Sequence, residues 1–373
     1  MKRLYFVAVV LFFVSCSGKS DTFTGEVIVS EELTFSVDTL ATGLTNPWGM
    51  AFLPDGRILI AERPGPLRLF ENGQLLPDPV KGLPAVWAHG QGGLLDVVLH
   101  PDYDDNKWIY IAYSARGDGQ GGNTAISRGR LVGDQFTDVE LLFHGQPHTP
   151  AAHHFGSRIV FDDDQYMFST IGDRGSQNNA QTLANHNGKV LRFYDDGRVP
   201  EDNPFVGVAD AMPEIWSYGH RNIQGMAFHP VTGELWTHEH GPQGGDEINR
   251  AEKGKNYGWP LATFGINYNG SIVSPDTTLP GMEDPVLHWT PSIAPCGLAF
   301  VDSDKYPGWH LNMLVGALAG QHIHRVVFDG NEVVHAEKLL QDFARFRDIR
   351  QGPDGYIYVL TEGPGIFFRI IPR

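Results

Sequence analysis

The chain has 373 residues, and its 44 acidic and 28 basic side chains give a formal net charge of −16. This charge excludes the basic footprint of nucleic-acid-binding proteins, so we expect no nucleic-acid partner. Hydrophobic residues make up 41% of the chain, enough for a packed core, while 44 glycines and 25 prolines indicate many tight turns, as in all-β proteins.

The chain begins with a predicted export signal. Two basic residues precede an apolar run over 4–14, and Cys16 follows, which is the pattern of a bacterial lipoprotein signal peptide. Phe13 stands where such signals usually carry leucine, and the alternative, an ordinary secretory signal, would also mean export. We therefore expect a signal peptide over 1–16, a flexible tether over 17–32, and an exported protein that is periplasmic or anchored to the outer membrane. Its only membrane contact would be a lipid on Cys16.

The body of the chain contains a single further cysteine, Cys296. One cysteine cannot form a disulfide within the chain, so packing must hold the fold together. We expect Cys296 to be buried and unreactive.

Six segments of the body share one pattern: a short apolar run, a turn of Asp, Gly, Pro or Asn, and a β-branched or aromatic run. They are FLPDGRILIAE (52–62), VLHPDYDDNKWIYIAY (98–113), VFDDDQYMFST (160–170), AFHPVTGELWTHE (227–239), AFVDSDKYPGWHLNMLVGAL (299–318) and IRQGPDGYIYVLTE (349–362). The pattern is typical of β-hairpins, and the spacing leaves room for one four-stranded blade per segment. We predict an all-β fold, a six-bladed β-propeller over 33–373, in preference to an irregular β-sandwich or two smaller barrels.

A glycine-rich acidic loop is a candidate calcium site. Asp246, Glu247 and Tyr257 accompany backbone carbonyls that Gly241 and Pro242 leave accessible. Hard cations such as Ca²⁺ take oxygen ligands of this kind. The loop lacks the fixed spacing of an EF-hand, and a solvated turn capped by Asp246 is the alternative.

Basic and amide side chains in separate repeats form a second candidate group. Gln91 lies between glycines, and Arg221 and Asn222 precede an apolar strand. Arg345 and Arg347 are two residues apart and are expected on one face of a strand. A propeller could bring the three arginines to one channel mouth, where they would bind carboxylates. The alternative for each arginine is an ordinary salt bridge.

The histidines occur in pairs. His153 and His154 stand just before a predicted strand, so alternation predicts that only one of them points into the channel. An imidazole there would suit a general base, because its pKa lies near neutrality. The pairs HEH (238–240) and HIH (322–324) have a spacing that a transition metal could use, but packed, hydrogen-bonded histidines are the expected alternative.

These features together resemble the glucose/sorbosone dehydrogenase family, which includes soluble aldose sugar dehydrogenases dependent on pyrroloquinoline quinone (PQQ). The similarity extends over 42–362, and four blocks carry it in family order: HHFGSRIVF, SYGHRNIQGMAF, GPQGGDEIN…GKNYGWP and PSIAPCGLAF. The resemblance implies a propeller with PQQ on top of its channel, a calcium ion (Ca²⁺) bridging to it, an aldose sugar substrate and an external electron acceptor.

The resemblance also implies a role for each candidate residue. His154 would be the general base that takes the proton from the sugar's anomeric hydroxyl, while hydride passes to the quinone and Arg221 stabilises the developing charge. The implied cofactor contacts are Gln91, His153, Arg221, Asn222, Arg345 and Arg347. The implied Ca²⁺ ligands are the carbonyls of Gly241 and Pro242 for the cofactor's ion, and Glu247 and Tyr257 for a second, structural ion. Ala319 stands where some relatives carry lysine, so one cofactor contact is missing.

Two other functions fit parts of the pattern. The acidic loop and the histidine pairs would suit a metal-dependent hydrolase such as a lactonase, which would leave Arg345 and Arg347 without a role. A non-catalytic propeller that binds a glycan or a protein is the other alternative.

Overall fold

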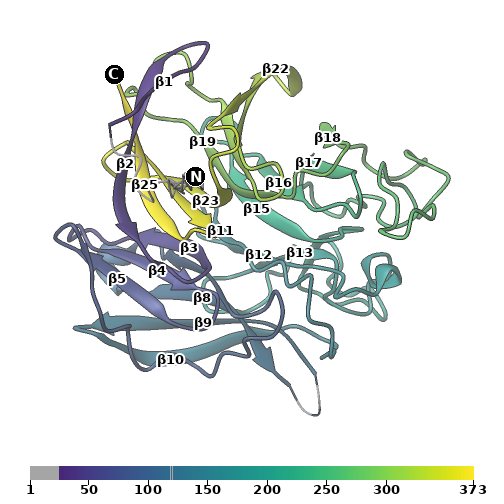
Figure 1. Cartoon of the computed structure of the whole chain (residues 1–373). Coiled ribbons are helices and arrows are strands. Elements are labelled where there is room, and N and C mark those ends of the chain that lie inside the picture. Colours follow the sequence, from purple (N-terminus) through teal and green to yellow (C-terminus); the bar gives the residue numbers. More distant parts are fainter. Residues whose placement is uncertain (1–24, 118, 120) are drawn as a thin grey trace, which may run out of the picture.

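A computed structural model describes residues 25–117, 119 and 121–373 (Figure 1). The predicted signal peptide, including Cys16, and the first part of the predicted tether lie outside these residues. The described chain is nearly all β and forms six antiparallel sheets around a centre, which confirms the predicted six-bladed propeller. In this part of the chain, no helix has the length and apolar character needed to cross a membrane.

The first five blades are each built from consecutive strands. The first blade contains β3 (Pro47–Phe52), β4 (Ile58–Glu62), β5 (Leu67–Glu71) and β6 (Gln74–Leu75). The second contains β7 (Leu94–Leu99), β8 (Ile109–Arg116), β9 (Gly122–Val132) and β10 (Gln135–His144), with the helix α1 (Tyr103–Asn106) between its first two strands. The third contains β11 (Ile159–Phe161), β12 (Met167–Ile171), β13 (Lys189–Phe193) and β14 (Ile215–Tyr218), with the 3-10 turn η1 (Gln177–Ala180). The fourth contains β15 (Ile223–Phe228), β16 (Leu235–Glu239), β17 (Asp246–Arg250) and β18 (Leu287–Trp289), and the fifth contains β19 (Pro295–Phe300), β20 (Met313–Ala317), β21 (Ile323–Asp329) and β22 (Glu332–Leu339).

The sixth blade joins the two ends of the described chain. Its inner strands are β23 (Arg345–Gln351), β24 (Ile357–Glu362) and β25 (Ile366–Pro372), and its outer strands are β2 (Thr34–Thr42) and β1 (Val27–Val29). Strand β2 pairs with β25, side by side in Figure 1, and so closes the ring of blades. The predicted tether over 17–32 differs from the structure at its end, because the β-branched segment Val27–Val29 pairs with β2 through a turn fixed by the Ser30 hydroxyl, which donates to the Leu33 carbonyl (2.7 Å).

The six hairpins predicted from sequence are the two innermost strands of the six blades. The innermost strands contact one another in a closed ring, in the order β3, β7, β11, β15, β19, β23 and back to β3. Six hydrophobic clusters fill the spaces between neighbouring blades. For example, Met50 and Ile60 of the first blade share a cluster with Leu360 of the sixth. Because each inner hairpin is covered on both faces, its strands appear in the sequence as continuous apolar runs.

A register shift recurs between the two innermost strands of five blades. The residues at these shifts are Trp48, Leu95, Asp96, Gln224, Gly297 and Arg347. Such a bulge turns a side chain out of the regular alternation and aims it in a new direction. Trp48, Gln224 and Arg347 all line one cavity at the same end of the channel. Three of the bulges therefore direct their side chains into the cavity at this end of the channel.

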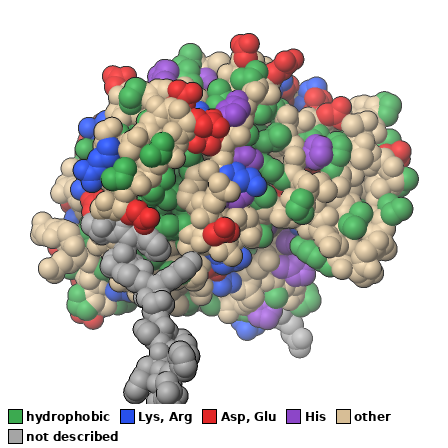
Figure 2. Space-filling model, turned by 45° about the horizontal axis from the view of Figure 1, so that its top comes forward, with side chains coloured by type: hydrophobic (Ala, Val, Ile, Leu, Met, Phe, Trp, Pro, Cys, Tyr) green, Lys and Arg blue, Asp and Glu red, His purple; other side chains and the backbone are tan. Residues whose placement is uncertain are grey.

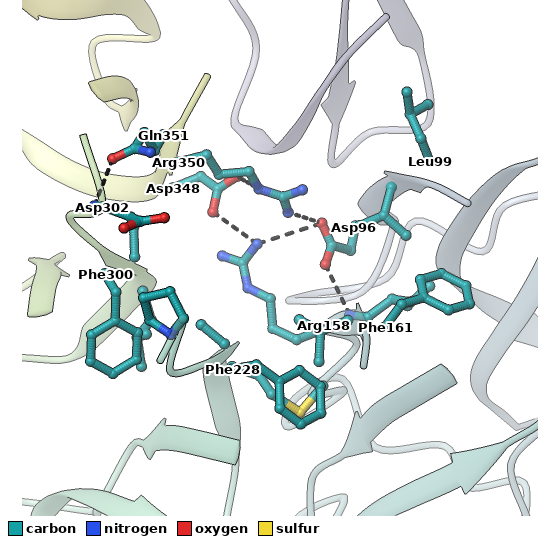
Figure 3. A pocket seen from close by; sticks show the side chains of 18 of the residues that line it. Asp96, Leu99, Arg158, Phe161, Phe228, Phe300, Asp302, Asp348, Arg350 and Gln351 are labelled. Carbon is teal, nitrogen blue, oxygen red and sulfur yellow. Dashed lines mark hydrogen bonds and ion pairs between the residues drawn. The ribbon is translucent and has the colours of Figure 1, made fainter. Parts of the chain in front are cut away.

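An ion-pair network lies across the channel, on the side of this cavity that faces the opposite mouth (Figure 3). Arg158 contacts Asp348 (2.9 Å) and Asp96 (3.6 Å), and Arg350 contacts the same two carboxylates. Asp96 also accepts a hydrogen bond from the backbone N–H of Ile159 (3.0 Å). The network thereby ties together the second, third and sixth blades. Beyond it lies a largely apolar cavity of about 380 Å³ at the opposite channel mouth.

Candidate active site

Two adjoining cavities occupy the channel mouth that carries the bulges. The arginine cavity, of about 320 Å³, is lined by Trp48, Arg63, Gln91, Leu95, Phe155, Gly156, Asn222, Gln224, His240, Tyr268, Ala294, Leu318, Arg345, Arg347 and Glu362. The histidine cavity, of about 470 Å³, is lined by Gln91, His153, His154, Asp173, Gly175, Gln177, Arg221, Pro242, Trp259, Asn267 and Tyr268. Gln91 and Tyr268 belong to both linings, so the two cavities are neighbours. Most of the residues predicted for the site from sequence meet here.

Both predicted histidines line the histidine cavity, so the expectation that only one could point inward is wrong. Strand β11 begins at Ile159, and His154 has a positive φ of 59°, so the pair does not lie on a strand and alternation does not apply. The two rings meet edge to face with their centroids 4.6 Å apart. Gly175 makes room for this arrangement, because a Cβ there would lie 2.3 Å from Nε2 of His153.

His154 is hydrogen-bonded to a buried carboxylate. Its Nδ1 lies 2.6 Å from Oδ1 of Asp173, whose other oxygen accepts a hydrogen bond from the Trp259 indole (2.9 Å). Burial lowers the pKa of His154 to about 4, and Asp173 opposes that shift. The imidazole is therefore neutral at pH 7. With Nδ1–H donating to Asp173, Nε2 has a free lone pair to accept a proton.

Arg174 holds the turn that carries the two histidines. Its guanidinium donates to the backbone carbonyls of His153 and Ala151 and lies over the Phe155 ring, 3.5 Å from the centroid. Arg174 itself has a positive φ of 56° and is buried. Burial lowers its pKa to about 9, so it remains charged at neutral pH. The turn geometry thus depends on a cation bonded to main-chain oxygens.

Arg221 also lines the histidine cavity. Its guanidinium donates to the carbonyls of His240 (2.9 Å) and Gly241 (2.7 Å) and lies over the Trp259 ring at 5.3 Å. Its backbone N–H donates to Glu239. The Gly241 carbonyl is also a predicted Ca²⁺ ligand. One of its lone pairs accepts from Arg221, and the second remains for another partner.

The two predicted amides link the cavities. Oε1 of Gln91 accepts from the backbone N–H of His154 (3.0 Å), and Oδ1 of Asn222 accepts from the backbone N–H of Gly156 (3.2 Å). Both residues therefore fix the backbone around the histidine turn from neighbouring blades. Both also line the arginine cavity.

Positive charge dominates the arginine cavity. Arg345 is exposed, donates to the Leu318 carbonyl (3.2 Å), and forms no ion pair with a described residue. Arg347 is buried and pairs with Glu362 (2.5 Å), which also lies 3.4 Å from Arg63. Although burial raises the pKa of Glu362, Arg347 and Arg63 lower it below its ordinary value, so one carboxylate stands among three arginines. The Nε atoms of Arg63 and Arg347 are buried and have no hydrogen-bond partner among the described residues. A planar ligand with several carboxylates, such as PQQ, fits this donor set.

The acidic loop divides into a structural part and a part suited to a cation. Asp246 accepts from the backbone N–H groups of Gly241, Ile293 and Ala294 and from the Ser292 hydroxyl, so its carboxylate fixes the loop. Glu247 is different. Burial, and then the neighbouring carboxylate of Glu239, raise its pKa well above the ordinary range. Two buried carboxylates side by side require a proton or a cation, which suits Ca²⁺.

Tyr257, the second predicted ligand of a structural Ca²⁺, uses its hydroxyl elsewhere. The hydroxyl donates to the Arg250 carbonyl and accepts from the backbone N–H of Glu252 (2.8 Å). Its ring stacks on His220, with centroids 4.6 Å apart, and His220 in turn bonds Glu239 (2.9 Å). His220 therefore lies between the Tyr257 ring and the carboxylate of Glu239, and the Tyr257 hydroxyl is bonded to the main chain instead. Neither Glu247 nor Tyr257 lines the two cavities.

The other histidine pairs are hydrogen-bonded within the fold. Nε2 of His238 and of His240 bond the carbonyls of Gly297 (3.0 Å) and Pro295 (2.8 Å). His324 accepts from the Trp289 indole (2.9 Å). Within the described ranges, no group of three or more His, Cys, Asp or Glu side chains is arranged to bind a metal ion. Cys296 is buried, as predicted, and its sulfur accepts from Arg347 (3.2 Å).

Sequence reasoning missed several residues of the site. Asp173 and Arg174 follow strand β12 in the segment IGDRG, and an acid at the end of an inner-hairpin strand was a signal that could have found them. Glu362 ends β24 and was hidden in a repeat segment. Tyr268 is 75% exposed on an irregular loop, and no periodic pattern in the sequence marks it.

Comparison with known proteins assigns the chain to a family. Residues 44–369 match the family described as Glucose / Sorbosone dehydrogenase. The chain belongs to the glucose/sorbosone dehydrogenase family. It is 45% identical over 347 residues to aldose sugar dehydrogenase YliI of Escherichia coli, a match that covers 91% of this chain and 94% of that protein.

Solved structures of this family share the fold. The soluble aldose sugar dehydrogenase of Escherichia coli in its apo-form has a TM-score of 0.88 and 45% identity, covering 91% of this chain and 100% of that chain. The PQQ-bound form of an aldose sugar dehydrogenase from Streptomyces coelicolor has a TM-score of 0.75 and 27% identity, covering 91% and 98%. The family resemblance inferred from the four sequence blocks is confirmed, and the chain is an oxidoreductase.

Proposed function

We propose that the protein oxidises aldose sugars at the anomeric carbon to lactones, with PQQ as the electron acceptor in the arginine cavity and Ca²⁺ beside it. One observation carries the proposal: a neutral histidine bonded to a buried carboxylate faces a cavity that adjoins a second cavity rich in arginine. The first arrangement removes a proton, and the second binds a polyanionic cofactor. The PQQ-bound relative supports this assignment.

The proton is handled by His154. Nε2 accepts the proton of the anomeric hydroxyl, while the hydrogen on the same carbon leaves with its electron pair. Asp173 holds the ring in the tautomer that keeps Nε2 free, and it stabilises the imidazolium that forms. PQQ, when bound, supplies the two-electron acceptor for that hydride. The sugar thus loses two electrons and two protons and becomes the lactone.

The arginines divide between binding and charge stabilisation. Arg345 and Arg347 would bind carboxylates of PQQ, with Gln91, Asn222 and His153 as further contacts. Arg221 is fixed by two carbonyls and directs its charge into the histidine cavity, where it would stabilise negative charge that develops during hydride transfer.

The oxygen atoms of the acidic loop would hold Ca²⁺. The Gly241 carbonyl accepts from Arg221, and Pro242 lines the same cavity as Arg221; the carbonyls of Gly241 and Pro242 would hold the ion next to PQQ. Glu247, with the Glu239 carboxylate and the backbone of Tyr257, would hold a second ion, which would neutralise the buried carboxylate pair.

We also propose that the protein is exported and reaches the periplasm or outer membrane as a lipoprotein on Cys16. The apolar run over 4–14 between two basic residues and Cys16 supports this. Electrons would then pass from the reduced cofactor to an external acceptor.

The test is oxidation of a panel of aldoses by apoprotein with an artificial dye acceptor. We expect activity only when PQQ and Ca²⁺ are added together, and loss of activity when a chelator removes Ca²⁺. Sugar oxidation without PQQ would contradict the proposal. Metal-dependent lactone hydrolysis with no acceptor present would favour a hydrolase instead.

A further inference from the structure

The ammonium of Lys189 is buried and is fully hydrogen-bonded by backbone carbonyls of the chain. Lys189 is the first residue of β13 and is fully buried, with an exposed fraction of 0%. Its ammonium donates to the carbonyls of Asn187 (2.7 Å), Asn179 (2.8 Å) and Ala180 (3.1 Å). Three N–H donors thus meet three acceptors, and no described carboxylate forms an ion pair with Lys189.

The three carbonyls belong to the loop that follows Asp173, whose carboxylate contacts His154. The side-chain amide of Asn179 donates to the backbone carbonyl of Asp173 (3.3 Å), so the loop is bonded to the main chain of that residue. Asp173 in turn holds Nδ1 of His154 (2.6 Å). Three consecutive contacts therefore run from the ammonium of Lys189 to the proposed base.

The same ammonium also reaches the segment of Arg221. The Ala180 carbonyl accepts both from Lys189 and from the backbone N–H of Gly219 (2.9 Å), two residues before Arg221. Lys189 is thus placed between the loop that follows Asp173 and the segment that carries the proposed charge-stabilising arginine.

Burying an ammonium costs free energy of desolvation, which packing alone does not explain. Burial lowers the pKa of Lys189 to about 7, and the negative charge of Asp173 opposes the shift. A methionine of similar length would fill the same space without the cost of desolvating a charge. The charge instead provides one common donor group for three main-chain oxygens, one of which, that of Ala180, also accepts from the backbone N–H of Gly219.

We propose that Lys189 is a positioning residue for sugar oxidation: its ammonium fixes the 177–187 loop and, through the bond from Asn179 to the Asp173 main chain, the position of Asp173, whose carboxylate orients His154. The proposal rests on the proposed function, because turnover is one of its readouts. A misplacement on the order of 1 Å costs about 10²-fold in rate, so the loop need move only slightly to matter.

The test compares Lys189→Met with Val326→Ala, a truncation in the core of the fifth blade, at conditions where both have the same folded fraction. We expect kcat per PQQ-loaded site to fall by about 10- to 100-fold in Lys189→Met, with the Kd for PQQ little changed, and to stay at the wild-type value in Val326→Ala. Ethylammonium added to a Lys189→Ala protein should recover part of the rate. A wild-type kcat in Lys189→Met, or an equal loss in both variants, would overturn the proposal.

Asn179→Ala provides a variant that does not depend on removing the buried charge. It keeps the backbone carbonyl that binds Lys189 and removes only the link to Asp173, so we expect a severalfold loss of kcat in a fully folded protein. An unchanged kcat would show that this link does not position the base.

Hydrogen exchange separates this proposal from the proposed function. Amides of 173–188 should exchange faster in Lys189→Met than in Val326→Ala, whether or not the wild-type protein oxidises sugars. Unchanged exchange would overturn the role of Lys189, whereas an inactive wild-type protein with faster exchange in Lys189→Met would overturn only the proposed chemistry.

Discussion

Both ends of the channel carry arginines, which are paired with carboxylates at one end and partly unpaired at the other. At one end, called the closed end here because an ion-pair network lies across the channel, Arg158 and Arg350 each contact both Asp96 and Asp348, and the four charges balance (Figure 3). At the open end, Arg345 has a single hydrogen bond to a carbonyl, although it lies in the same strand as Arg350.

The difference separates a structural cluster from a binding site. Charged groups that are buried and fully paired hold neighbouring blades together, and they have no donor left for a ligand. Arginines with unused donors around one shared carboxylate present a net positive charge to whatever enters. Charge on the outer surface does not show this contrast, since basic side chains on the face in Figure 2 are scattered among acidic and polar ones.

The largest effect is expected at the open end. His154→Ala removes the proton acceptor, so kcat should fall by about 10³-fold, while PQQ binding and the Tm of the apoprotein stay near the wild-type values. Steady-state kinetics and PQQ titration check this. His335→Ala, at an exposed histidine, is the control and should keep full activity. Retained turnover in His154→Ala would show that His154 is not the base.

The closed end should respond in the opposite way. Asp348→Asn leaves Arg158 and Arg350 short of one buried negative charge, so we expect the free energy of unfolding to fall by about 3–5 kcal/mol. Chemical denaturation measures the loss, and kcat per folded molecule should not change. Asp55→Asn breaks the exposed pair with Arg57 and should cost under about 1 kcal/mol. Equal costs for the two variants would contradict the contrast between buried and exposed pairs.

Arg345→Met tests whether the unpaired arginine binds the cofactor. Loss of one charged hydrogen-bonding partner should weaken PQQ binding by about 10- to 100-fold and leave the Tm of the apoprotein unchanged, because no described carboxylate loses its partner. Arg198→Met, at a surface arginine, should change neither quantity. A fall in Tm without weaker binding would make Arg345 structural, like Arg158.

The pH dependence tests the state of the base. Burial lowers the pKa of His154 to about 4, so the neutral form that accepts a proton is present above that pH and is lost below it. The acid limb of kcat/KM should therefore lie near pH 4. In Asp173→Asn it should move to still lower pH, because the carboxylate raises the pKa of His154. An acid limb near 6.5 would mean that His154 is solvated in the working enzyme.

The smallest effect is expected at Ala319, which is exposed and stands where some relatives carry lysine. Ala319→Lys should tighten PQQ binding by no more than about fivefold, because an exposed charge contributes under about 1 kcal/mol. Titration at low and high salt measures the gain, which should shrink as salt increases. Unchanged binding at low salt would show that this loop does not face the cofactor.

The fold was largely predictable because its pattern is local and repeated. Each inner hairpin carries its own apolar runs and turn residues, and six of them specify the propeller. The closure by β2 was not apparent, since it joins distant ends of the chain. Neither was strand β1, whose segment Val27–Val29 falls within the predicted tether.

The site was only partly predictable because its side chains depart from regular alternation. The bulge at Arg347 and the positive φ of His154 both redirect side chains that the two-residue period would place elsewhere. Asp173 and Lys189 act through contacts between distant backbone segments, which no sequence spacing reveals.

A single-turnover experiment tests the central claim most directly. Apoprotein loaded with Ca²⁺ and one equivalent of PQQ is mixed with one equivalent of an aldose in the absence of oxygen and of any other acceptor. We predict that the absorbance of the oxidised quinone disappears at the rate at which lactone forms, with one lactone produced per PQQ. Lactone formation with no change in the quinone spectrum, or no reaction in fully loaded protein with any aldose, would contradict the account.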